Sequence, residues 1–390
     1  MSKAKLWMII SAVMIVIGII GGALIVINGE SAMGTTDRVP WGAMIGAYVF
    51  FVVSSTGLCL VSSLGHVFGI ERFEIIGKRA VTFAIITLLA GFVVIGLELG
   101  SPLNMIWILF TPNFMSAIWW MGALYGLYMV LLFVELFFMI KNNHKYATIA
   151  GTLAFISAIA AHSNLGAVFG FINARPFWAG PYLSIYFIMS AFLSGAAILS
   201  IMFYFVEKKG GTVKYKGEHI VPVLGKLLAM FIGMTMFFVT WKLITGLYGG
   251  MYGKYEGVMA LISGPLAFNF WVFEVGFGML IPFLILMLPG GFQVRRVFIA
   301  SVFTMIGIFF MRYDLVVAGQ IVPLKVVDGL QETVLHVYHT ALPAWGVIIG
   351  ALGMALFLFL LAEQKLPLDY KEHAHEEPAE KAEKVVNAEA

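Results

Sequence analysis

The stretch HSNLGAVFGFINARPFWAGP, residues 162–181, places polar side chains inside a long apolar run. His162 lies near the middle of the apolar run 146–172. A histidine there can hydrogen-bond across helices as an ordinary core residue, carry a proton or bind a metal. Asn164 follows two residues later and cannot share a helix face with His162. The two side chains are therefore expected to face two different neighbours.

The metal chemistry open to this chain is narrow. The only cysteine is Cys59, so no thiolate cluster can form within the chain. A membrane haem usually needs two histidines at matching depth on facing helices. His66, His336 and His339 all stand at the ends of apolar runs. We therefore expect no haem or metal bound by this chain.

Three charged residues interrupt other apolar runs: Glu135 in LLFVELFF, Glu274 in NFWVFEVGFGML and Lys242 in VTWKLITG. A charge in such surroundings is costly unless it meets a partner or water, so each is a functional candidate. Glu135 is either a proton-relay carboxylate or an interfacial group near Lys141 and Lys145. Lys242 and Glu274 are either a structural pair or part of a proton path.

The composition is that of a membrane protein. Hydrophobic residues make up 61% of the 390 residues and charged residues only 12%, about half the charged share of a soluble protein. An apolar run of about 20 residues crosses the hydrocarbon core as a helix. Ten runs meet that rule, so we predict an all-α integral membrane protein with spans at 6–27, 41–68, 77–97, 114–140, 146–172, 182–206, 221–248, 265–288, 294–313 and 334–361.

The distribution of positive charge predicts the orientation. Ten spans put both termini on one side, and 18 of the 24 lysines and arginines fall in the loops and tails of that side. Basic loops stay in the cytoplasm. Both termini are therefore expected to be cytoplasmic, in a multi-pass protein of the cytoplasmic (inner) membrane.

The loops of the other side are longer and rich in aromatic residues, proline and glycine, which favours a partner or a site there. Arg38, Arg175 and Arg312 are assigned to that side against the charge bias, so each is a candidate for docking a partner. Trp178 fits the aromatic belt of a membrane interface. Arg312 and Asp314, in MRYDLVVAGQ, are also expected to pair structurally at the end of the ninth span.

The predicted organisation has five parts. Residues 1–34 form the first span and its outer loop, and residues 316–363 an outer loop and the last span. Residues 35–176 and 177–315 form two helical bundles. Residues 364–390, rich in Ala, Glu, Lys and His without an apolar stripe, are expected to be a disordered cytoplasmic tail.

Four motifs occur in an order that resembles one known family. They are TTDRVPWG with AYVFFVVSSTGLCLVSSL, the run LELGSPLNMIWILFTPNFMSAIWWMGALYGLYMV, then HSNLGAVFG with RPFWAGPYLSIYFIMSAFLSGAAIL, and finally MRYDLVVAGQ. From about residue 35 to residue 360 the chain resembles the NrfD/polysulfide-reductase membrane subunits. Ten spans match the larger branch of that family, found in hydrogenase, Dsr-type and Hmc-type respiratory complexes.

The resemblance implies a quinone module without haem or metal of its own. Spans two to five and six to nine would each form a four-helix bundle, flanked by the first and last helices. A menaquinone or other quinone would bind near the outer face of the first bundle. A ferredoxin-like subunit with [4Fe–4S] clusters would dock above it and exchange electrons with further catalytic or multihaem cytochrome subunits. Lipid, and no nucleic acid, completes the expected partners.

The resemblance also gives the residues expected roles. His162 and Tyr125 are candidates for hydrogen bonds to the quinone oxygens, because quinone reduction consumes two protons as well as two electrons. Trp41 would pack against the ring and Asn164 would help to orient it. Glu135 would lie on a proton route from the inner side. The competing interpretation is that these groups only pack the core.

Two other functions remain open from the sequence. A secondary transporter or ion-translocating protein without quinone chemistry would suit the Lys242/Glu274 pair and the two-bundle plan. A purely structural anchor would need no pocket. An intermediate case is a quinone module coupled to proton translocation through Glu135, Glu274 and Lys242.

Overall fold

The computed structural model describes residues 3–100, 105–211, 213–324 and 334–369. Ten helices in this part of the chain are long and apolar enough to cross a membrane. The predicted all-helical membrane fold with ten spans is confirmed. The spans are α1 (Lys3–Asn28), α2 (Ala43–His66), α3 (Gly77–Glu98), α5 (Ala117–Ile140), α6 (His144–Gly170), α7 (Tyr182–Lys208), α8 (Ile220–Tyr248), the continuous pair η4 (Asn269–Leu280) and α10 (Ile281–Met287), α11 (Val294–Ile321) and α12 (Leu342–Lys365).

Short elements occupy several connections. Two are 3-10 helices, η1 (Glu30–Met33) and η2 (Glu71–Ile76), and two are α-helices, α4 (Trp107–Phe110) and α9 (Lys254–Ile262). Strands β1 (Lys214–Tyr215) and β2 (Glu218–His219) pair as a small antiparallel hairpin. Helix α9 lies in the outer loop expected between the seventh and eighth spans.

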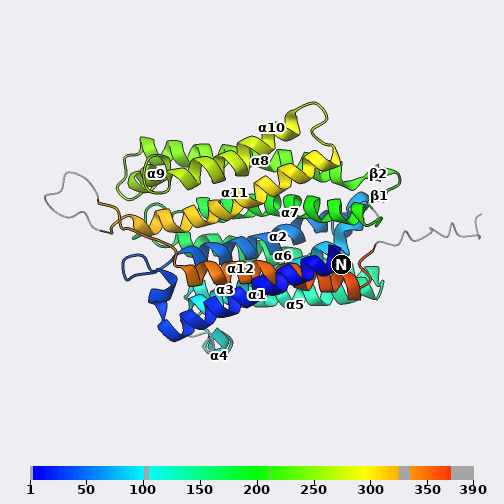
Figure 1. Cartoon of the computed structure of the whole chain (residues 1–390), viewed down its shortest axis with the longest axis horizontal. Helices are drawn as coiled ribbons and strands as arrows, with labels where there is room; N and C mark the ends of the chain where they lie inside the picture. The colour runs from blue at the N-terminus through cyan, green and yellow to red at the C-terminus, as the bar shows by residue number, and fades with distance from the viewer. Residues whose placement is uncertain (1–2, 101–104, 212, 325–333, 370–390) are drawn as a thin grey trace, which may run out of the picture.

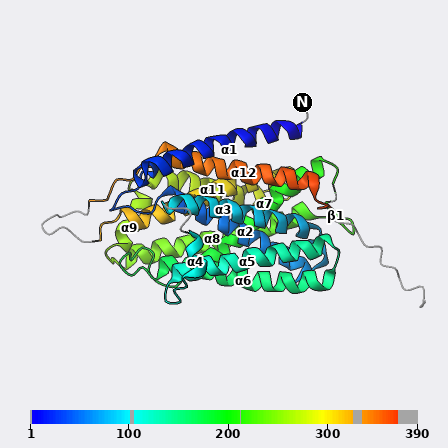
Figure 2. The same ribbon diagram turned by 90° about the horizontal axis from the view of Figure 1, so that it is seen from below.

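We divide the eight spans between α1 and α12 into two groups by their order in the chain (Figures 1 and 2). The first group comprises α2, α3, α5 and α6, and the second comprises α7, α8, the η4–α10 pair and α11. Helices α1 and α12 lie side by side against α3, outside both groups. The position of each helix decides how much of it is buried. In the most apolar 18 residues of α2, 94% are buried, whereas in α1 only 22% are.

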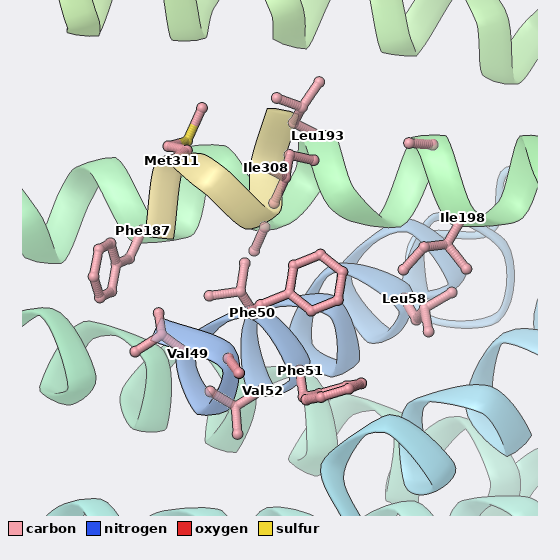
Figure 3. Packing of buried hydrophobic residues seen from close by; sticks show 14 of the residues in the cluster. Val49, Phe50, Phe51, Val52, Leu58, Phe187, Leu193, Ile198, Ile308 and Met311 are labelled. Atoms are coloured by element: carbon pink, nitrogen blue, oxygen red, sulfur yellow. The ribbon is translucent and has the colours of Figure 1, made fainter. Parts of the chain in front are cut away.

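Helices α2, α7 and α11 join the two groups. Side chains of all three interdigitate at this boundary, including Phe50 of α2, Leu193 of α7 and Ile308 of α11 (Figure 3). The backbones of α2 and α7 cross closely, because a Cβ on Gly57 would lie 1.9 Å from the carbonyl oxygen of Ala191. Only glycine permits this crossing.

The two ends of the molecule are distinct. Helix α1 begins and α12 ends on the same face, which we call the terminal face; the opposite end is the distal face (Figure 1). Helices α2 and α5 both end at the terminal face, so His66 lies there. The loop between α6 and α7 lies at the distal face, together with α9.

Two span boundaries lie eight residues away from the predicted ones, 321 against 313 and 342 against 334. The ninth span was expected to end at residue 313, but α11 continues to Ile321. The tenth span was expected to begin at residue 334, but α12 begins at Leu342. The sequence misled because charges normally mark the end of a span, whereas Arg312 and Asp314 are both fully buried within α11. Of the predicted tail, residues 370–390 lie outside the described residues.

Candidate functional site

A histidine–tyrosine pair lies at the centre of the first helix group. Tyr125 of α5 contacts His162 of α6, with 2.9 Å between the hydroxyl oxygen and Nδ1. The other ring nitrogen, Nε2, lies 3.1 Å from the carbonyl oxygen of Phe187 in α7. Because a carbonyl only accepts, Nε2 of the neutral ring carries the proton and Nδ1 accepts from Tyr125. Both side chains are fully buried.

Aromatic rings fill the space between this pair and the distal face. Trp41 stacks on Trp178 at 5.7 Å and meets the edge of Phe169 at 5.5 Å. Phe169 in turn packs on Phe187, whose carbonyl holds His162. The indole nitrogen of Trp178 donates to the carbonyl of Leu315 at 2.8 Å. Three of the four expected quinone residues, His162, Tyr125 and Trp41, are therefore linked through packed aromatic rings.

Asn164 lies apart from them. Its side-chain amide donates to the carbonyl of Ala117 at the beginning of α5, over 2.9 Å. One helical turn further along α6, an open groove of about 520 Å³ lies between the distal ends of α6 and α7. Ala167, Asn173 and Ser184 are among its lining residues. Asn164 is not among the residues that line the groove, and its amide faces α5.

A second polar contact lies near the terminal face. Oε1 of Glu135 is 2.6 Å from Nε2 of His66, and only 1% of the Glu135 side chain is exposed. Within the described residues, Oε2 of Glu135 has no hydrogen-bond partner. Gly151 of α6 makes room for the contact, because a Cβ there would lie 2.6 Å from Nε2 of His66. The sequence had named Lys141 and Lys145 as neighbours and missed His66.

This contact borders a cavity that opens near the terminal face. The cavity is about 200 Å³, and its lining includes His66, Lys78, Asn142 and Thr148. Most of these side chains are polar, unlike the lipid-facing surfaces of the same helices. Water from that face therefore has a route to His66, and through it to the buried Glu135.

Polar side chains continue inward from Glu135. On α5, Tyr128 lies two helical turns from Glu135 and donates to the carbonyl of Ser55 at 3.1 Å. The Ser55 hydroxyl donates to the carbonyl of Ala84 at 2.8 Å and also lies 3.3 Å from the Tyr128 hydroxyl. The rings of Tyr128 and Tyr125 are 6.4 Å apart. The facing sides of α2 and α5 thus hold polar groups between the terminal-face cavity and His162.

The second helix group contains Glu274, Arg312, Asp314 and Lys242, of which the first three are almost fully buried. Glu274 of η4 is 3% exposed, and Arg312 and Asp314 of α11 are 0% exposed. Lys242 of α8 is half-buried, with Nζ 4.6 Å from the centre of the Phe177 ring. Within the described residues, no nitrogen–oxygen contact shorter than 4.0 Å joins any two of the four. The expected Lys242/Glu274 and Arg312/Asp314 pairs are therefore not contact ion pairs.

The three arginines predicted to dock a partner are placed very differently. Arg312 is fully buried, so its expected surface position was wrong. Arg175 is half-buried and donates to the carbonyls of Gln320 and Val322 at 2.9 and 2.7 Å, which ties the α6–α7 loop to the end of α11. Arg38 alone of the three is exposed.

Titration at the distal face follows from the same residues. Partial burial, followed by the positive charges of Arg38 and Arg175, lowers the pKa of His336 below its usual value of 6.5. His336 is therefore neutral at pH 7. The positive charge that this part of the distal face presents at neutral pH comes from the arginines.

A family model described as "Polysulphide reductase, NrfD" matches residues 31–324. The chain belongs to the NrfD family. A selenate reductase subunit of Mesobacillus selenatarsenatis is 25% identical over 415 residues, which cover 94% of this chain and 95% of the relative. The Hdr-like menaquinol oxidoreductase integral membrane subunit of Archaeoglobus fulgidus is 26% identical over 359 residues, with 89% of each chain covered. The resemblance inferred from the motifs is thus confirmed.

The NrfD match spans both helix groups, from the loop before α2 to the end of α11. It leaves out all of α1 and all of α12, the two helices that pack outside both groups. Both sites described above therefore lie within the matched region. Sequence reasoning had found His162, Tyr125 and Glu135 there, but it had not linked His66 to Glu135 or placed Asp314 in the interior.

Proposed function

We propose that this NrfD-family protein is the quinone-interacting membrane subunit of a redox complex. The observation that carries the proposal is the buried Tyr125–His162 hydrogen bond beneath the aromatic rings of the distal face. Two relatives that match most of the chain support it, because their names describe a menaquinol oxidoreductase membrane subunit and a selenate reductase subunit. Quinone chemistry needs an apolar seat and a proton carrier. The Tyr125–His162 pair would be the proton carrier, and the aromatic rings above it would form the apolar surroundings.

In this proposal the quinone head approaches from the distal face, beside Trp41, and reaches Tyr125. Tyr125 and His162 exchange one proton between the tyrosine oxygen and Nδ1, while the carbonyl of Phe187 fixes the imidazole ring. The open groove between α6 and α7, lined by Ala167, Asn173 and Ser184, is the alternative seat. The two seats lie on different surfaces of α6, so variants can separate them.

Protons would reach the pair from the terminal face. His66 and Glu135 would take them up from the cavity, and Tyr128 and Ser55 would carry them towards Tyr125. We place the terminal face in the cytoplasm, because the basic loops lie there. Glu274 and Lys242 belong to a separate candidate path in the second group.

The redox partner would dock at the distal face. We propose an extracytoplasmic ferredoxin-like subunit with [4Fe–4S] clusters, joined to a catalytic or multihaem cytochrome subunit. Arg38 is exposed there and available to an acidic surface, whereas Arg175 holds the loops that would support the partner. Electrons would then pass between the clusters and a quinone beneath Trp41.

The test uses the purified complex, with menaquinone content and menaquinol-driven reduction of the partner's clusters as readouts. Tyr125→Phe removes one hydroxyl, and we expect turnover to fall by roughly a hundredfold, the usual contribution of a positioned proton carrier, while bound menaquinone is retained. Tyr204→Phe is the matched control, because Tyr204 stacks on Phe298 near the other end of α7 from Phe187.

Ser184→Trp distinguishes the seats by filling the groove between α6 and α7. If only this variant loses its bound menaquinone, the quinone binds in the groove and not beside Tyr125. Unchanged turnover in both Tyr125→Phe and His162→Ala would refute the proposed site. Substrate uptake by the isolated chain in vesicles, without quinone reduction, would favour the transporter alternative.

A further inference from the structure

We propose that Glu274, Asp314 and Arg312 form a buried proton-binding site in the second helix group, and that Arg312 links its proton occupancy to the state of the Tyr125–His162 pair. The link to that pair rests on the proposed quinone function. The proton site itself does not, because it follows from the packing of η4 against α11.

Backbone packing brings the two carboxylates together. A Cβ on Gly307 of α11 would lie 2.0 Å from Cα of Gly278 in η4, so the two helices touch there. They run in opposite directions from this contact. Asp314 lies two turns after Gly307 on the same face, and Glu274 lies about one turn before Gly278. Both carboxylates therefore face the η4–α11 seam on the distal side of the glycine contact.

Several polar atoms in this seam lack partners. Within the described residues, neither carboxylate oxygen of Asp314 has a hydrogen bond, and neither do Nε and Nη1 of Arg312. Asn269, at the beginning of η4, is the polar side chain that approaches Asp314. Buried polar groups are nearly always satisfied, so such a set calls for an explanation. A carboxylate that is buried without donors is commonly neutralised by a proton.

The helix that carries Glu274 is itself unusual. η4 is a π-helix of 12 residues, whereas π-turns in proteins are rare and are concentrated at functional sites. The wider turn changes which residues face α11, and here it directs Glu274 inward, 3% exposed. A regular α-helix over the same residues would give the side chain a different direction.

Arg312 stands between this seam and the first group. Its guanidinium carbon lies 4.8 Å from the centre of the Phe187 ring, and it donates to the hydroxyl of Ser190. Phe187 also supplies the carbonyl that contacts His162. Met311, its neighbour in the chain, lies at the boundary between the groups with Phe187 (Figure 3). One phenylalanine thus separates Arg312 from His162.

The charged and titratable groups around Glu274 come from three elements. They are Tyr182 and Tyr186 of α7, Lys242 of α8, and Arg312 and Asp314 of α11. From the first group, Tyr125 and His162 also interact electrostatically with Arg312.

If both carboxylates are ionised, Lys242 and Arg312 balance their charge. A positive charge on His162 repels Arg312 towards the carboxylates, which favours release of a proton from the seam into bulk water. A neutral His162 lets the guanidinium remain over Phe187. Binding at one site and proton occupancy at the other are therefore reciprocal.

The test uses the full chain in lipid nanodiscs and a fluorescent hydroxyquinoline N-oxide analogue of menaquinol. Two readouts are recorded across pH: the Kd of the analogue, and the infrared carbonyl band of protonated carboxyl groups. In the wild type, we expect the Kd to change at least about fivefold across the pH range, a usual size for coupling between sites. The infrared band should change on analogue binding.

Glu274→Gln and Asp314→Asn keep the shape of the side chain and remove its titration. We expect each to flatten the pH dependence of the Kd and to remove infrared intensity. Glu218→Gln is the control, since Glu218 is exposed on β2 at the terminal face. Arg312→Lys should keep the infrared band but weaken its response to the analogue.

The outcomes separate the two proposals. The wild type could fail to bind the analogue and still show a titrating infrared band that Glu274→Gln abolishes. That result would refute the quinone function and support the proton site. The inference would be overturned if the analogue binds but neither carboxyl variant alters the pH dependence of its Kd or the infrared band. Should Arg312→Lys fail to fold, the two carboxyl variants decide alone.

Discussion

His162 shows how one contact fixes the chemistry of a side chain. Its Nε2 faces a carbonyl, which has no proton to give, so the neutral ring must accept from Tyr125 at Nδ1. The pair is therefore set to receive a proton at the tyrosine oxygen. Sequence alone indicated both residues through a resemblance, but not this direction, because Phe187 is 25 residues away in the chain.

The His66–Glu135 contact gives a prediction at the same scale. Gly151→Ala would place a methyl group 2.6 Å from Nε2 of His66 and 3.0 Å from Oε1 of Glu135. We expect the pair to separate and menaquinol turnover to fall by roughly tenfold or more, since misplacement by about 1 Å can cost a hundredfold. Turnover should become slower without loss of bound menaquinone.

Gly126→Ala on α5 is the control for this prediction, because nothing lies within 4 Å of a Cβ at that position. Its turnover should match the wild type. Equal turnover in both alanine variants would show that the His66–Glu135 contact does not deliver protons.

At the scale of elements, η4 and α11 show the limits of hydropathy. The number and order of the spans followed from apolar length, because lipid leaves no alternative to a helix. A π-helix contains the same apolar residues as an α-helix, so no sequence signal marked η4. The end of α11 was misplaced for a related reason. A hydropathy value records that Arg312 and Asp314 are polar, but it does not record whether their side chains face the protein interior or the solvent.

The glycine contact between these two helices predicts a stability effect. Gly307→Ala would force a methyl group to within 2.0 Å of Cα of Gly278 and 2.8 Å of the carbonyl oxygen of Phe273. We expect the free energy of unfolding to fall by about 1–3 kcal/mol, as for other overpacked cores. Thermal unfolding in detergent measures it.

Gly233→Ala on α8 is the matched control, since its Cβ would meet only the Phe283 ring at 3.8 Å, an ordinary contact. A Gly307→Ala protein as stable as this control would mean that η4 and α11 do not approach as closely as described.

At the scale of the whole molecule, the end of α12 returns to the first helix group. Nε of Arg79 in α3 contacts Glu363 at 2.7 Å, and its Nη2 contacts Asp369 at 2.8 Å. Between them Leu368 is buried and lines the cavity beside His66. The sequence predicted a disordered tail from residue 364 because charge dominates there, and it could not show that Leu368 is buried or that Asp369 contacts Arg79.

This arrangement predicts that residues 366–369 cover the terminal-face cavity. Deletion of residues 366–390 should increase the rate at which diethyl pyrocarbonate modifies His66, measured by peptide mass spectrometry. Deletion of 370–390 keeps Leu368 and Asp369 and should leave that rate unchanged. Equal rates in both truncated proteins and the wild type would show that Leu368 does not shield His66.

The packing of α1 has a consequence for biosynthesis. Its main contact is with α12, through backbone-close positions such as Gly18 and Gly350. Helix α12 follows α1 only after the eight other described spans, so α1 waits in the bilayer without this partner until all of them and α12 have been synthesised. A chain that stops early leaves those glycines facing lipid, where the quality-control proteases of the cell can recognise an orphaned helix.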